Sequence, residues 1–375
     1  MHLLYFLNSI TNSGGMERIV IDKINYLAEL NDYKVALAYY GTEKDKSFFP
    51  INKRISLLPI SINAEGYSFV KKIKSFNKLR NQLGSIIDKV RPDVIINANM
   101  KLVSWLLPYI SKEIPKIVEL HFSYEGLQIM NREIYGHNFY KSWINNILRQ
   151  IFYPKYDRCI VLTEEDRRDW GFRNIVVIPN FTNLKPIGFS DVHKRKKAIN
   201  VGRLMYQKNQ RMLVEAWSIV NRDYPDWELE IWGSGDLYDD LVALIQKLKV
   251  EKTVKLMGVS HNIEEVYSYA SFFVLSSRYE GQPLVMIEAL QFGLPCVCFA
   301  VNGVRGTIRD GENGYIIEDM TAEALASGVL KMIKHQDEIP IMAQQAKESA
   351  RYFEKEHIMK RWIELFEELA NENRN

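Results

Sequence analysis

Residues 276–297 read SSRYEGQPLVMIEALQFGLPCV and connect two apolar runs, SFFVLSS and LPCVCFA, through a loop and a helical pattern. A strand, a helix and a second strand in succession are typical of a parallel sheet with crossover helices. Short β-rich runs alternate with longer helical patterns in the same way along the rest of the chain. The stretch therefore predicts an α/β fold.

This alternation occurs twice, because it starts again after the polar, basic connector FSDVHKRKK. The runs before it are LLYFL, YKVALAYY, RISLLPI, DVIINA, KIVELHF, RCIVLT and NIVVIP, and those after it are AINVGRL, WELEIWG, VKLMG, SFFVLSS, LPCVCFA and NGYII. A length of 375 residues suits two domains at roughly 150 residues each. We predict doubly wound, Rossmann-like domains over 1–185 and 186–353 that face each other across a cleft, and a terminal helix over 354–375 that crosses back to the first domain.

The composition favours a soluble, cytoplasmic protein. Hydrophobic residues make up 47% and charged residues 25%, which is close to the average for globular proteins and excludes a disordered or collagen-like chain. No apolar run approaches the roughly 18 to 20 residues of a membrane-spanning helix. The first residues, MHLLYFLNSI, have no basic residue before the apolar run, so we expect a first strand there and no signal peptide. The three cysteines show no disulfide or zinc-ligand spacing.

Positive charge is concentrated in the first half of the chain. Residues 1–185 carry 26 basic and 18 acidic side chains, and residues 186–375 carry 23 and 28. Seven of the basic residues lie in 66–91, where apolar residues recur at helical spacing: Phe69, Val70, Ile73, Phe76, Leu79 and Leu83. This pattern predicts either a basic amphipathic helix on an anionic membrane surface or a surface helix with its apolar stripe on the core. No nucleic-acid-binding module accompanies the charge.

Two carboxylates flank the helix start in the quoted stretch. Glu280 lies in the loop, Pro283 is expected to open the helix as its first residue, and Glu288 lies more than one turn into it. The free amides of Leu284 and Val285, with the helix dipole, form an anion site, and carboxylates accept hydrogen bonds from sugar hydroxyls. The alternative is a glutamate that stabilises the helix dipole and a second, unrelated glutamate.

A pair of cations follows the strand at AINVGRL. Arg203 comes directly after this strand, and Lys208 stands five residues later, near the start of the next helix. Together they could neutralise a diphosphate, because arginine provides a bidentate fork and lysine a point charge. The alternative is two solvated cations at a strand end.

Paired glycines mark two further loops. Gly14 and Gly15 follow the first strand, and Gly233 and Gly235 follow WELEIW, but neither pair completes the dinucleotide fingerprint G-x-G-x-x-G. Both could instead form tight turns without a ligand. His121 ends a strand in VELHFSYEG, where cleft residues gather, although a lone histidine there is more often structural.

The sequence lacks the signature motifs of several enzyme classes. The motifs Asp-x-Asp, His-Glu-x-x-His and Gly-x-Ser-x-Gly are absent, as is a phosphate loop ending in Gly-Lys-Ser or Gly-Lys-Thr. We therefore expect neither a bound metal nor a cofactor.

Taken in order, these motifs resemble the retaining glycosyltransferases of family 4, which have the GT-B fold. The resemblance covers nearly the whole chain and includes Gly293, Pro295 and the DGENGYII stretch over 310–317. Its main positions are Gly14, Gly15, His121, Pro179, Asn180, Gly202, Arg203, Lys208, Asn209, Gly233, Gly235, Gly258, Glu280, Gly281 and Glu288.

The resemblance implies a role for each of these site residues. Arg203 and Lys208 would bind the donor diphosphate, Glu288 the ribose, Glu280 the transferred sugar, and His121 would line the sugar site. The remaining donor-binding positions would be Gly15, Gly202, Gly258, Val259, Gly281, Gln282, Leu284 and Val285, with the turn at Gly258 and Val259 on the base.

The resemblance also implies the reaction. It is the transfer of a hexose or N-acetylhexosamine from a nucleotide sugar, which we expect to be a UDP-sugar. The acceptor would be a sugar on a membrane lipid, in capsule or lipopolysaccharide assembly. Many members of the family have Phe-Gly after the Glu-Gly pair, where this chain has Gln282 and Pro283. Proline offers no N–H to the donor, so the identity of the sugar stays open. The acceptor, the linkage formed and the oligomeric state also stay open.

Three other functions are compatible with parts of this pattern. A sugar-nucleotide epimerase of the same fold would cleave the same bond without an acceptor. A non-catalytic sugar-binding protein would normally need an export signal. A degenerate transferase acting as a membrane scaffold fits poorly with the intact set Glu280, Glu288, Arg203 and Lys208.

Overall fold

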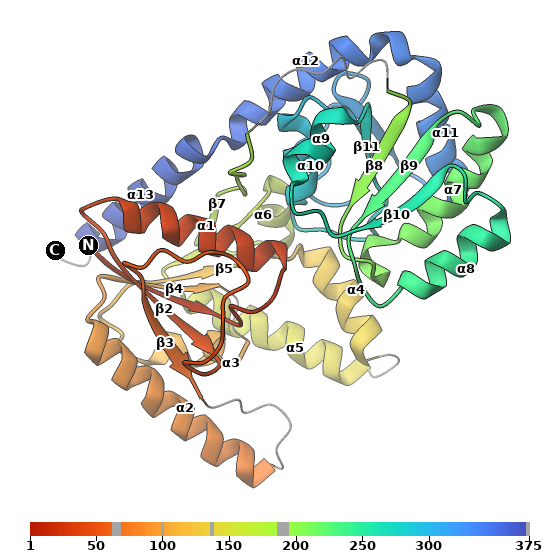
Figure 1. The fold of residues 1–375 in the computed structure, drawn as a ribbon. Coiled ribbons are helices and arrows are strands. Elements are labelled where there is room, and N and C mark those ends of the chain that lie inside the picture. Colours follow the sequence, from red (N-terminus) through yellow and green to blue (C-terminus); the bar gives the residue numbers. More distant parts are fainter. Residues whose placement is uncertain (62–68, 99–100, 136–138, 186–194, 373–375) are drawn as a thin grey trace. The chain divides into compact units, whose positions relative to one another are not determined.

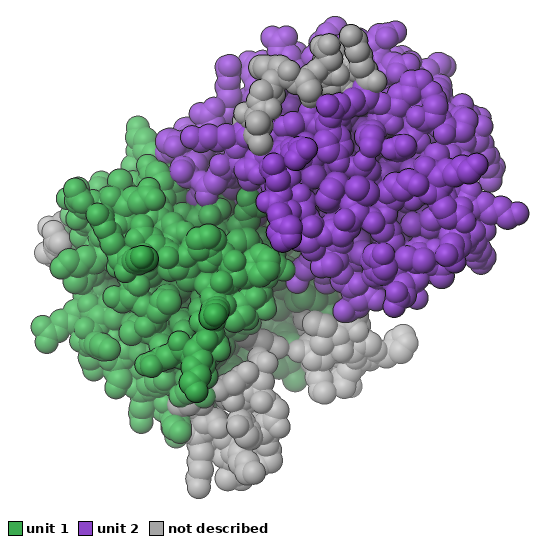
Figure 2. Space-filling model, in the orientation of Figure 1, with its two compact units in different colours: residues 1–179, 358–375 green, residues 180–357 purple. Residues whose placement is uncertain are grey.

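The chain folds into two compact units, which Figure 2 shows in green and purple. Unit 1 consists of residues 1–179 and 358–375, and unit 2 of residues 180–357. The computed structural model describes residues 1–61, 69–98, 101–135, 139–185 and 195–372. The first boundary, after residue 179, lies six residues before the one predicted after 185. The second, after residue 357, lies four residues beyond the one predicted after 353.

Unit 1 is built on a seven-stranded parallel sheet in the order β3-β2-β1-β4-β5-β6-β7. The strands are β1 (His2–Leu7), β2 (Lys34–Tyr40), β3 (Ser56–Ile60), β4 (Val94–Ala98), β5 (Lys116–Glu119), β6 (Arg158–Val161) and β7 (Ile175–Val177). The helices are α1 (Gly15–Glu29), α2 (Phe69–Val90), α3 (Lys101–Leu106), α4 (Tyr124–Tyr135), α5 (Phe139–Phe152) and α6 (Glu164–Trp170). The chain winds outward from β1 in both directions, as in a doubly wound fold.

The central strand β1 shows why the sequence folds this way. Its residues 3–7 are all fully buried, as expected for a parallel strand covered on both faces. Leu4 and Phe6 belong to the core cluster that contains Leu79 and Leu83 of α2, and the ring of Tyr5, which alternates with them, lies against α1. Helices α1 and α2 therefore cover opposite faces of the sheet (Figure 1).

Unit 2 repeats this winding in a six-stranded parallel sheet, in the order β10-β9-β8-β11-β12-β13. The strands are β8 (Lys197–Val201), β9 (Glu228–Trp232), β10 (Val254–Gly258), β11 (Phe272–Leu275), β12 (Cys296–Phe299) and β13 (Gly314–Ile317). The helices are α7 (Gln210–Asp223), α8 (Tyr238–Leu248), α9 (Ile263–Tyr269), α10 (Leu284–Gln291), α11 (Ala322–Lys334) and α12 (Ile339–Ala350). The prediction of two doubly wound α/β domains is confirmed.

The terminal helix α13 (Lys355–Glu372) passes from unit 2 into unit 1 within its first turn. In unit 1, Arg361 donates a hydrogen bond to the carbonyl of Val177 at 2.5 Å, and Arg158 forms ion pairs with Glu368 and Glu372. The C-terminal residues of the chain are therefore an integral part of the first unit.

Two expectations fall partly on residues outside the described ranges. Most of the connector FSDVHKRKK lies there, as do the side chains of residues 66–75 in the basic segment. In the rest of α2, Leu79 and Leu83 are fully buried, whereas Phe76 is 38% exposed. Leu79 and Leu83 thus face the core of unit 1, and membrane binding by this helix stays a prediction.

Candidate functional site

In unit 2 the site residues predicted from the sequence follow two neighbouring strands. Strand β8 pairs with β9 on one side and with β11 on the other, and the winding of the sheet reverses between β8 and β11. Ligands of open α/β sheets bind outside the carboxyl ends of the strands at such a reversal. Arg203 and Lys208 follow β8, and Glu280 follows β11, so the topology brings these three residues to one place.

Backbone and side-chain hydrogen bonds join the loops after β8 and β11. The amide of Arg278 donates to the carbonyl of Gln207 at 2.8 Å, and the Gln207 side chain donates to the carbonyl of Tyr279 at 3.0 Å. The Ser276 hydroxyl donates to the carbonyl of Lys208 at 2.8 Å. Because these bonds run in both directions between the loops, the two loops form one rigid platform.

Lys208 and Glu280 form an ion pair on this platform. Lys208 Nζ lies 2.6 Å from Glu280 Oε1, and their side chains are 18% and 9% exposed. Arg203 is exposed, and its guanidinium has no partner among the residues that the structure describes. The sequence predicted that Arg203 and Lys208 share an anion, but it gave no sign that Lys208 is paired with Glu280 in the free protein.

The start of α10 leaves backbone amides without acceptors. Pro283 has an extended ψ of 112° and is the N-cap, not the first helical residue that the sequence predicted, because the helical conformation begins one residue later. The first bonds of the helix run from Met286 to the Pro283 carbonyl, and the amides of Leu284 and Val285 have no acceptor in the described part of the chain. These amides and the positive end of the helix dipole make this end of α10 suitable for an anion.

Gln282 lies at this loop but is fastened within unit 2. Its side-chain oxygen accepts a hydrogen bond from the amide of Asn180 at 2.7 Å, and the Asn180 side chain donates to the Gln282 carbonyl at 3.1 Å. Both residues are buried. The side chain of Gln282 therefore holds the loop in position, and its predicted contact with the donor stays a prediction. The carbonyl oxygen of the neighbouring Gly281 lies close to Gly303: a Cβ added to Gly303 would come within 2.2 Å of it.

Glu288 is buried in the middle of α10, at 2% exposure. Tyr267 from α9 donates a hydrogen bond to Glu288 Oε2 at 2.8 Å. A carboxylate held by a tyrosine hydroxyl keeps acceptor capacity for further donors. Tyr267 was not predicted as a site residue, because a tyrosine in an amphipathic helix gives no signal that its hydroxyl meets a carboxylate.

Two glycines of unit 2 have positive φ angles, and one of them is also required by close packing of the backbone. Gly233 has φ +142°, and a Cβ at this position would lie 1.9 Å from the carbonyl oxygen of Gly202. Gly258 has φ +75° with open space around the Cβ position, and the next residue, Val259, is 58% exposed. The amide of Gly233 donates to the Gly258 carbonyl at 2.7 Å, so the loops after β8, β9 and β10 are connected in series.

In unit 1 the glycine pair forms the start of α1. Gly14 is the N-cap and Gly15, which is exposed, is the first helical residue. A Cβ on Gly14 would lie 2.3 Å from the carboxylate of Glu17, which accepts a hydrogen bond from Asn12 at 3.1 Å. The Glu17 carboxylate therefore fills the space beside Gly14, and the approach of Gly15 to a ligand stays a prediction.

His121 follows β5 and contacts a buried carboxylate. His121 Nε2 lies 3.1 Å from Glu119 Oε2, and Glu119 Oε1 lies 2.5 Å from Lys23 Nζ. Burial by itself raises the pKa of Glu119, but the charge of Lys23 and the contact with His121 outweigh it and lower this pKa to about 2. Burial lowers the pKa of Lys23, and the carboxylate counteracts that fall. The sequence did not indicate Glu119 and Lys23, which lie 96 residues apart.

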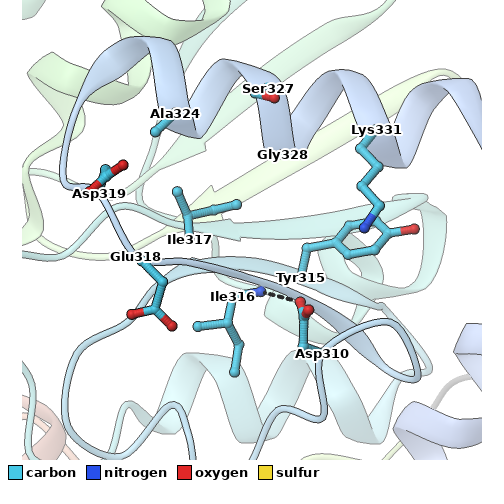
Figure 3. A pocket seen from close by; sticks show the side chains of 10 residues that line it. All are labelled: Asp310, Tyr315, Ile316, Ile317, Glu318, Asp319, Ala324, Ser327, Gly328 and Lys331. Atoms are coloured by element: carbon cyan, nitrogen blue, oxygen red, sulfur yellow. Dashed lines mark hydrogen bonds between the residues drawn. The ribbon is translucent and has the colours of Figure 1, made fainter.

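A shallow pocket of about 280 Å³ lies elsewhere in unit 2, between β13 and α11 (Figure 3). Its lining includes the carboxylates of Asp310, Glu318 and Asp319, and the ammonium of Lys331 lies over the ring of Tyr315 at 4.0 Å. Asp310 accepts a hydrogen bond from the amide of Ile316, as the dashed line in Figure 3 shows. None of the predicted site residues lines this pocket.

The described residues lack two features that other functions would require. They contain no group of three or more histidine, cysteine, aspartate or glutamate side chains that could hold a metal ion. Within the same residues, no helix combines the length and the apolar character that a membrane span requires.

Family models match both halves of the chain. The model described as Glycosyltransferase Family 4 matches residues 13–185, and the model described as Glycosyl transferases group 1 matches residues 188–352. The chain belongs to the family 4 glycosyltransferases. The suspected family is thereby confirmed.

Relatives of similar length support this assignment. The chain is 27% identical to an uncharacterized glycosyltransferase of Haemophilus influenzae, over 96% of this chain and 98% of that protein. It is 25% identical to the amylovoran biosynthesis glycosyltransferase AmsD of Erwinia amylovora, over 97% and 99%. It is 24% identical, over 99% and 100%, to a Campylobacter jejuni α-1,4-N-acetyl-D-galactosaminyltransferase whose name specifies an undecaprenol diphosphate-linked acceptor.

Solved structures share the fold. Sucrose-phosphate synthase from Thermosynechococcus elongatus superimposes with a TM-score of 0.82 at 18% identity, covering 98% of each chain. Anabaena HepE, in complex with UDP and glucose, gives 0.76 at 18% identity, covering 97% of this chain and 99% of that one. The fold of this family 4 glycosyltransferase is GT-B, as predicted.

Proposed function

We propose that the protein transfers a hexose or N-acetylhexosamine from a UDP-sugar to a lipid-linked sugar acceptor, with retention of the anomeric configuration, in surface polysaccharide biosynthesis. Glycosyltransferase activity in glycan biosynthesis is supported by the family models and by relatives such as AmsD. One observation carries the proposal for the donor. Arg203, the Lys208–Glu280 ion pair and the free amides of α10 lie on loops at the same reversal of the sheet.

The charges of these groups suit a departing diphosphate. Negative charge grows on the leaving nucleotide as the glycosidic bond breaks, and cations and amides that are already in place stabilise it without rearranging. Arg203 has no partner among the described residues, so its charge is available. Lys208 would shift from Glu280 to the diphosphate, which frees Glu280 to accept hydrogen bonds from the hydroxyls of the transferred sugar. The acceptor hydroxyl would then attack from the face that the nucleotide leaves.

The other predicted residues complete this proposal. Glu288, oriented by Tyr267, would bind the ribose hydroxyls, and the turn at Gly258 and Val259 would contact the base. His121 of unit 1 would contribute to the sugar site. Gly15, the exposed first residue of α1, would contribute its amide to the diphosphate.

The names of relatives support the choice of donor and acceptor. HepE was crystallised with UDP and glucose, and the Campylobacter jejuni relative is named for an N-acetylgalactosaminyl transfer to a polyprenyl diphosphate glycan. A lipid-linked acceptor would bring the enzyme to the cytoplasmic face of the membrane, and the basic excess of residues 1–185 would favour an anionic lipid surface there. We propose that this basic first half binds the acceptor.

Calorimetry with UDP, GDP and ADP tests the donor assignment. We expect UDP to bind the tightest, and a hydrolysis screen over UDP-sugars then identifies the sugar. Proton NMR of the product, formed from an α-linked donor, reports the anomeric configuration, which we expect to be α. Tighter binding of GDP or ADP would contradict the donor, and a β-linked product would contradict retention. Consumption of the UDP-sugar that an acceptor does not accelerate would instead indicate a hydrolase or an epimerase.

Metal independence forms part of the proposal, because Arg203 and Lys208 supply the positive charge that a metal ion provides in other transferases. We expect turnover to be unchanged by EDTA. Activity that EDTA abolishes and magnesium or manganese restores would contradict this.

A further inference from the structure

A line of buried contacts in unit 1 connects the terminal helix α13 to His121. The indole ring of Trp362 in α13 lies 3.6 Å from Lys23 Nζ in α1. Lys23 forms an ion pair at 2.5 Å with Glu119 Oε1 at the end of β5, and the other oxygen of Glu119 lies 3.1 Å from His121 Nε2. The four side chains come from three separate parts of the chain, yet they form one continuous series of contacts.

This series is costly to bury. The side chains of Lys23 and Glu119 are 2% and 3% exposed, and a buried ion pair usually stabilises a fold no more than a well-packed apolar pair does. The ring of Tyr5 lies 5.4 Å from Lys23 Nζ, and the Tyr5 hydroxyl has no hydrogen-bond partner among the described residues. Stability alone therefore does not explain why Lys23 and Glu119 are buried in unit 1. Because the series of contacts ends at His121, a role in orienting this histidine would explain it.

The geometry at His121 shows what Glu119 can do. Nε2 is buried and has no hydrogen bond of good angular geometry among the described residues, and Glu119 Oε2 is the carboxylate oxygen that lies beside it, at 3.1 Å. Nδ1 has no partner among the same residues. In a neutral imidazole one nitrogen donates and the other accepts, and the hydrogen bond of one nitrogen decides the role of the other.

We propose that Glu119 is a positioning residue that accepts the Nε2 proton of His121 and so leaves Nδ1 as the nitrogen that accepts a hydrogen bond from a hydroxyl of the donor sugar. Lys23 holds the opposite oxygen of Glu119, and Trp362 covers Lys23. The terminal helix α13 is then part of the apparatus that orients a site residue. This inference rests on the proposed function for the role of His121 in the sugar site, but the tautomer of His121 can be measured without any substrate.

Nitrogen NMR of the imidazole rings tests the tautomer directly. His121 is one of seven histidines, and its signals are assigned by their loss in His121→Gln. In the wild type we expect Nε2 protonated and Nδ1 unprotonated. In Glu119→Gln the amide oxygen would face Lys23 and the amide N–H would face His121, so we expect the opposite tautomer. A wild-type ring protonated at Nδ1, or an unchanged tautomer in Glu119→Gln, would overturn the proposal.

Turnover tests whether the reaction uses this orientation. We expect kcat of Glu119→Gln to fall about 100-fold, the scale for a group misplaced by about 1 Å. The affinity for UDP should stay near the wild-type value, because the contacts proposed for the nucleotide, apart from the amide of Gly15, come from residues of unit 2. A tautomer change with full turnover would overturn the role in catalysis. Absence of UDP binding and of transfer in the wild type would instead contradict the proposed function, and the NMR measurement would still decide the tautomer.

Two further variants guard against misfolding and nonspecific effects. Lys23→Met with Glu119→Leu removes both buried charges at nearly constant volume, so it should fold even if Glu119→Gln does not. It should lose the single Nε2-protonated tautomer and show a similar fall in kcat. Glu338→Gln is the matched control, because Glu338 contacts the exposed His335 at 3.0 Å on the surface of unit 2. It should leave the His121 signals and the turnover unchanged.

Discussion

The loops after β8 and β11 in unit 2 and the end of β5 in unit 1 are held in place by different means. In unit 2, backbone carbonyls and amides join the loops, and glycines allow the backbones to approach each other closely. In unit 1, the position of His121 depends on a buried series of charged side chains. A scaffold of backbone bonds leaves its side chains free to act on a ligand, whereas a scaffold of buried charges depends on the ionisation of each member.

The largest expected effect comes from the cations of the unit 2 loops. Arg203→Ala and Lys208→Ala should each raise the barrier to transfer by about 2.7 to 4 kcal/mol, as loss of an oxyanion-hole donor does, because both charges act on the departing diphosphate. Steady-state kinetics would show a fall in kcat of roughly 100-fold to 1,000-fold, with the Tm of Arg203→Ala unchanged.

A matched control for these variants is Arg211→Ala, which removes a cation from a nearby helix. The Arg211 side chain is 64% exposed and pairs with Glu215 on the same helix. This variant should keep wild-type turnover. Near wild-type turnover in folded Arg203→Ala and Lys208→Ala would show that the diphosphate assignment is wrong.

The glycine scaffold of unit 2 can be broken by one methyl group. Gly233→Ala would place a Cβ 1.9 Å from the Gly202 oxygen at a φ of +142°, so it should lower the free energy of unfolding by about 3 kcal/mol. Gly84→Ala is the matched control in unit 1. Gly84 lies inside α2, and a Cβ added to it would have no atom of another element within 4 Å among the described residues. It should raise stability by about 0.5 to 1 kcal/mol. Calorimetric unfolding of both variants measures these changes. Equal stabilities of Gly233→Ala and Gly84→Ala would contradict the close approach of Gly233 to the Gly202 carbonyl.

The buried charges of unit 1 should give it a distinctive acid sensitivity. The pKa of Glu119 falls from 4.5 to about 2 on folding, so its ionised form stabilises the protein fully above pH 4.5 and loses this effect as the pH drops towards 2. The difference of about 2.5 units corresponds to a contribution on the order of 3 kcal/mol.

Urea unfolding between pH 5 and 2.5 measures this contribution. The stability of the wild type relative to Lys23→Met with Glu119→Leu should fall by an amount on the order of 3 kcal/mol as the pH drops through this window, because only the wild type carries the Glu119 carboxylate. A constant difference would mean that folding leaves the pKa of Glu119 unchanged.

The sequence predicted the fold and the place of the unit 2 residues because both depend on local patterns. Alternating strand and helix patterns determine the order of the elements, and strand ends show which loops carry ligands. Arg203, Lys208 and Glu280 could be named because each lies in a loop after a strand, and Glu288 because it lies eight positions after Glu280 in the following helix.

The partners of these residues could not be predicted, because they depend on contacts between distant parts of the chain. Lys208 meets Glu280 across 72 residues, and Lys23 meets Glu119 across 96. A lysine in the middle of α1 usually lies on the solvated face of the helix. Its burial here follows from the carboxylate at the end of β5, which no spacing along α1 reveals.

The two carboxylates around α10 give the smallest expected effect and the sharpest test of the unit 2 site. Glu288 is buried and oriented by Tyr267, whereas Glu280 is paired with Lys208 at the edge of the platform. We expect Glu288→Ala to weaken UDP binding by about 1.5 to 3 kcal/mol, since hydrogen bonds to a charged group contribute on that scale. Glu280→Ala should leave UDP affinity nearly intact and should reduce turnover and discrimination among donor sugars, because a site that hydrogen-bonds a hydroxyl rejects a sugar that lacks it. Calorimetric titration of UDP into both variants distinguishes the roles. Equal losses, or a larger loss for Glu280→Ala, would mean that the ribose and the transferred sugar have been assigned to the wrong carboxylates.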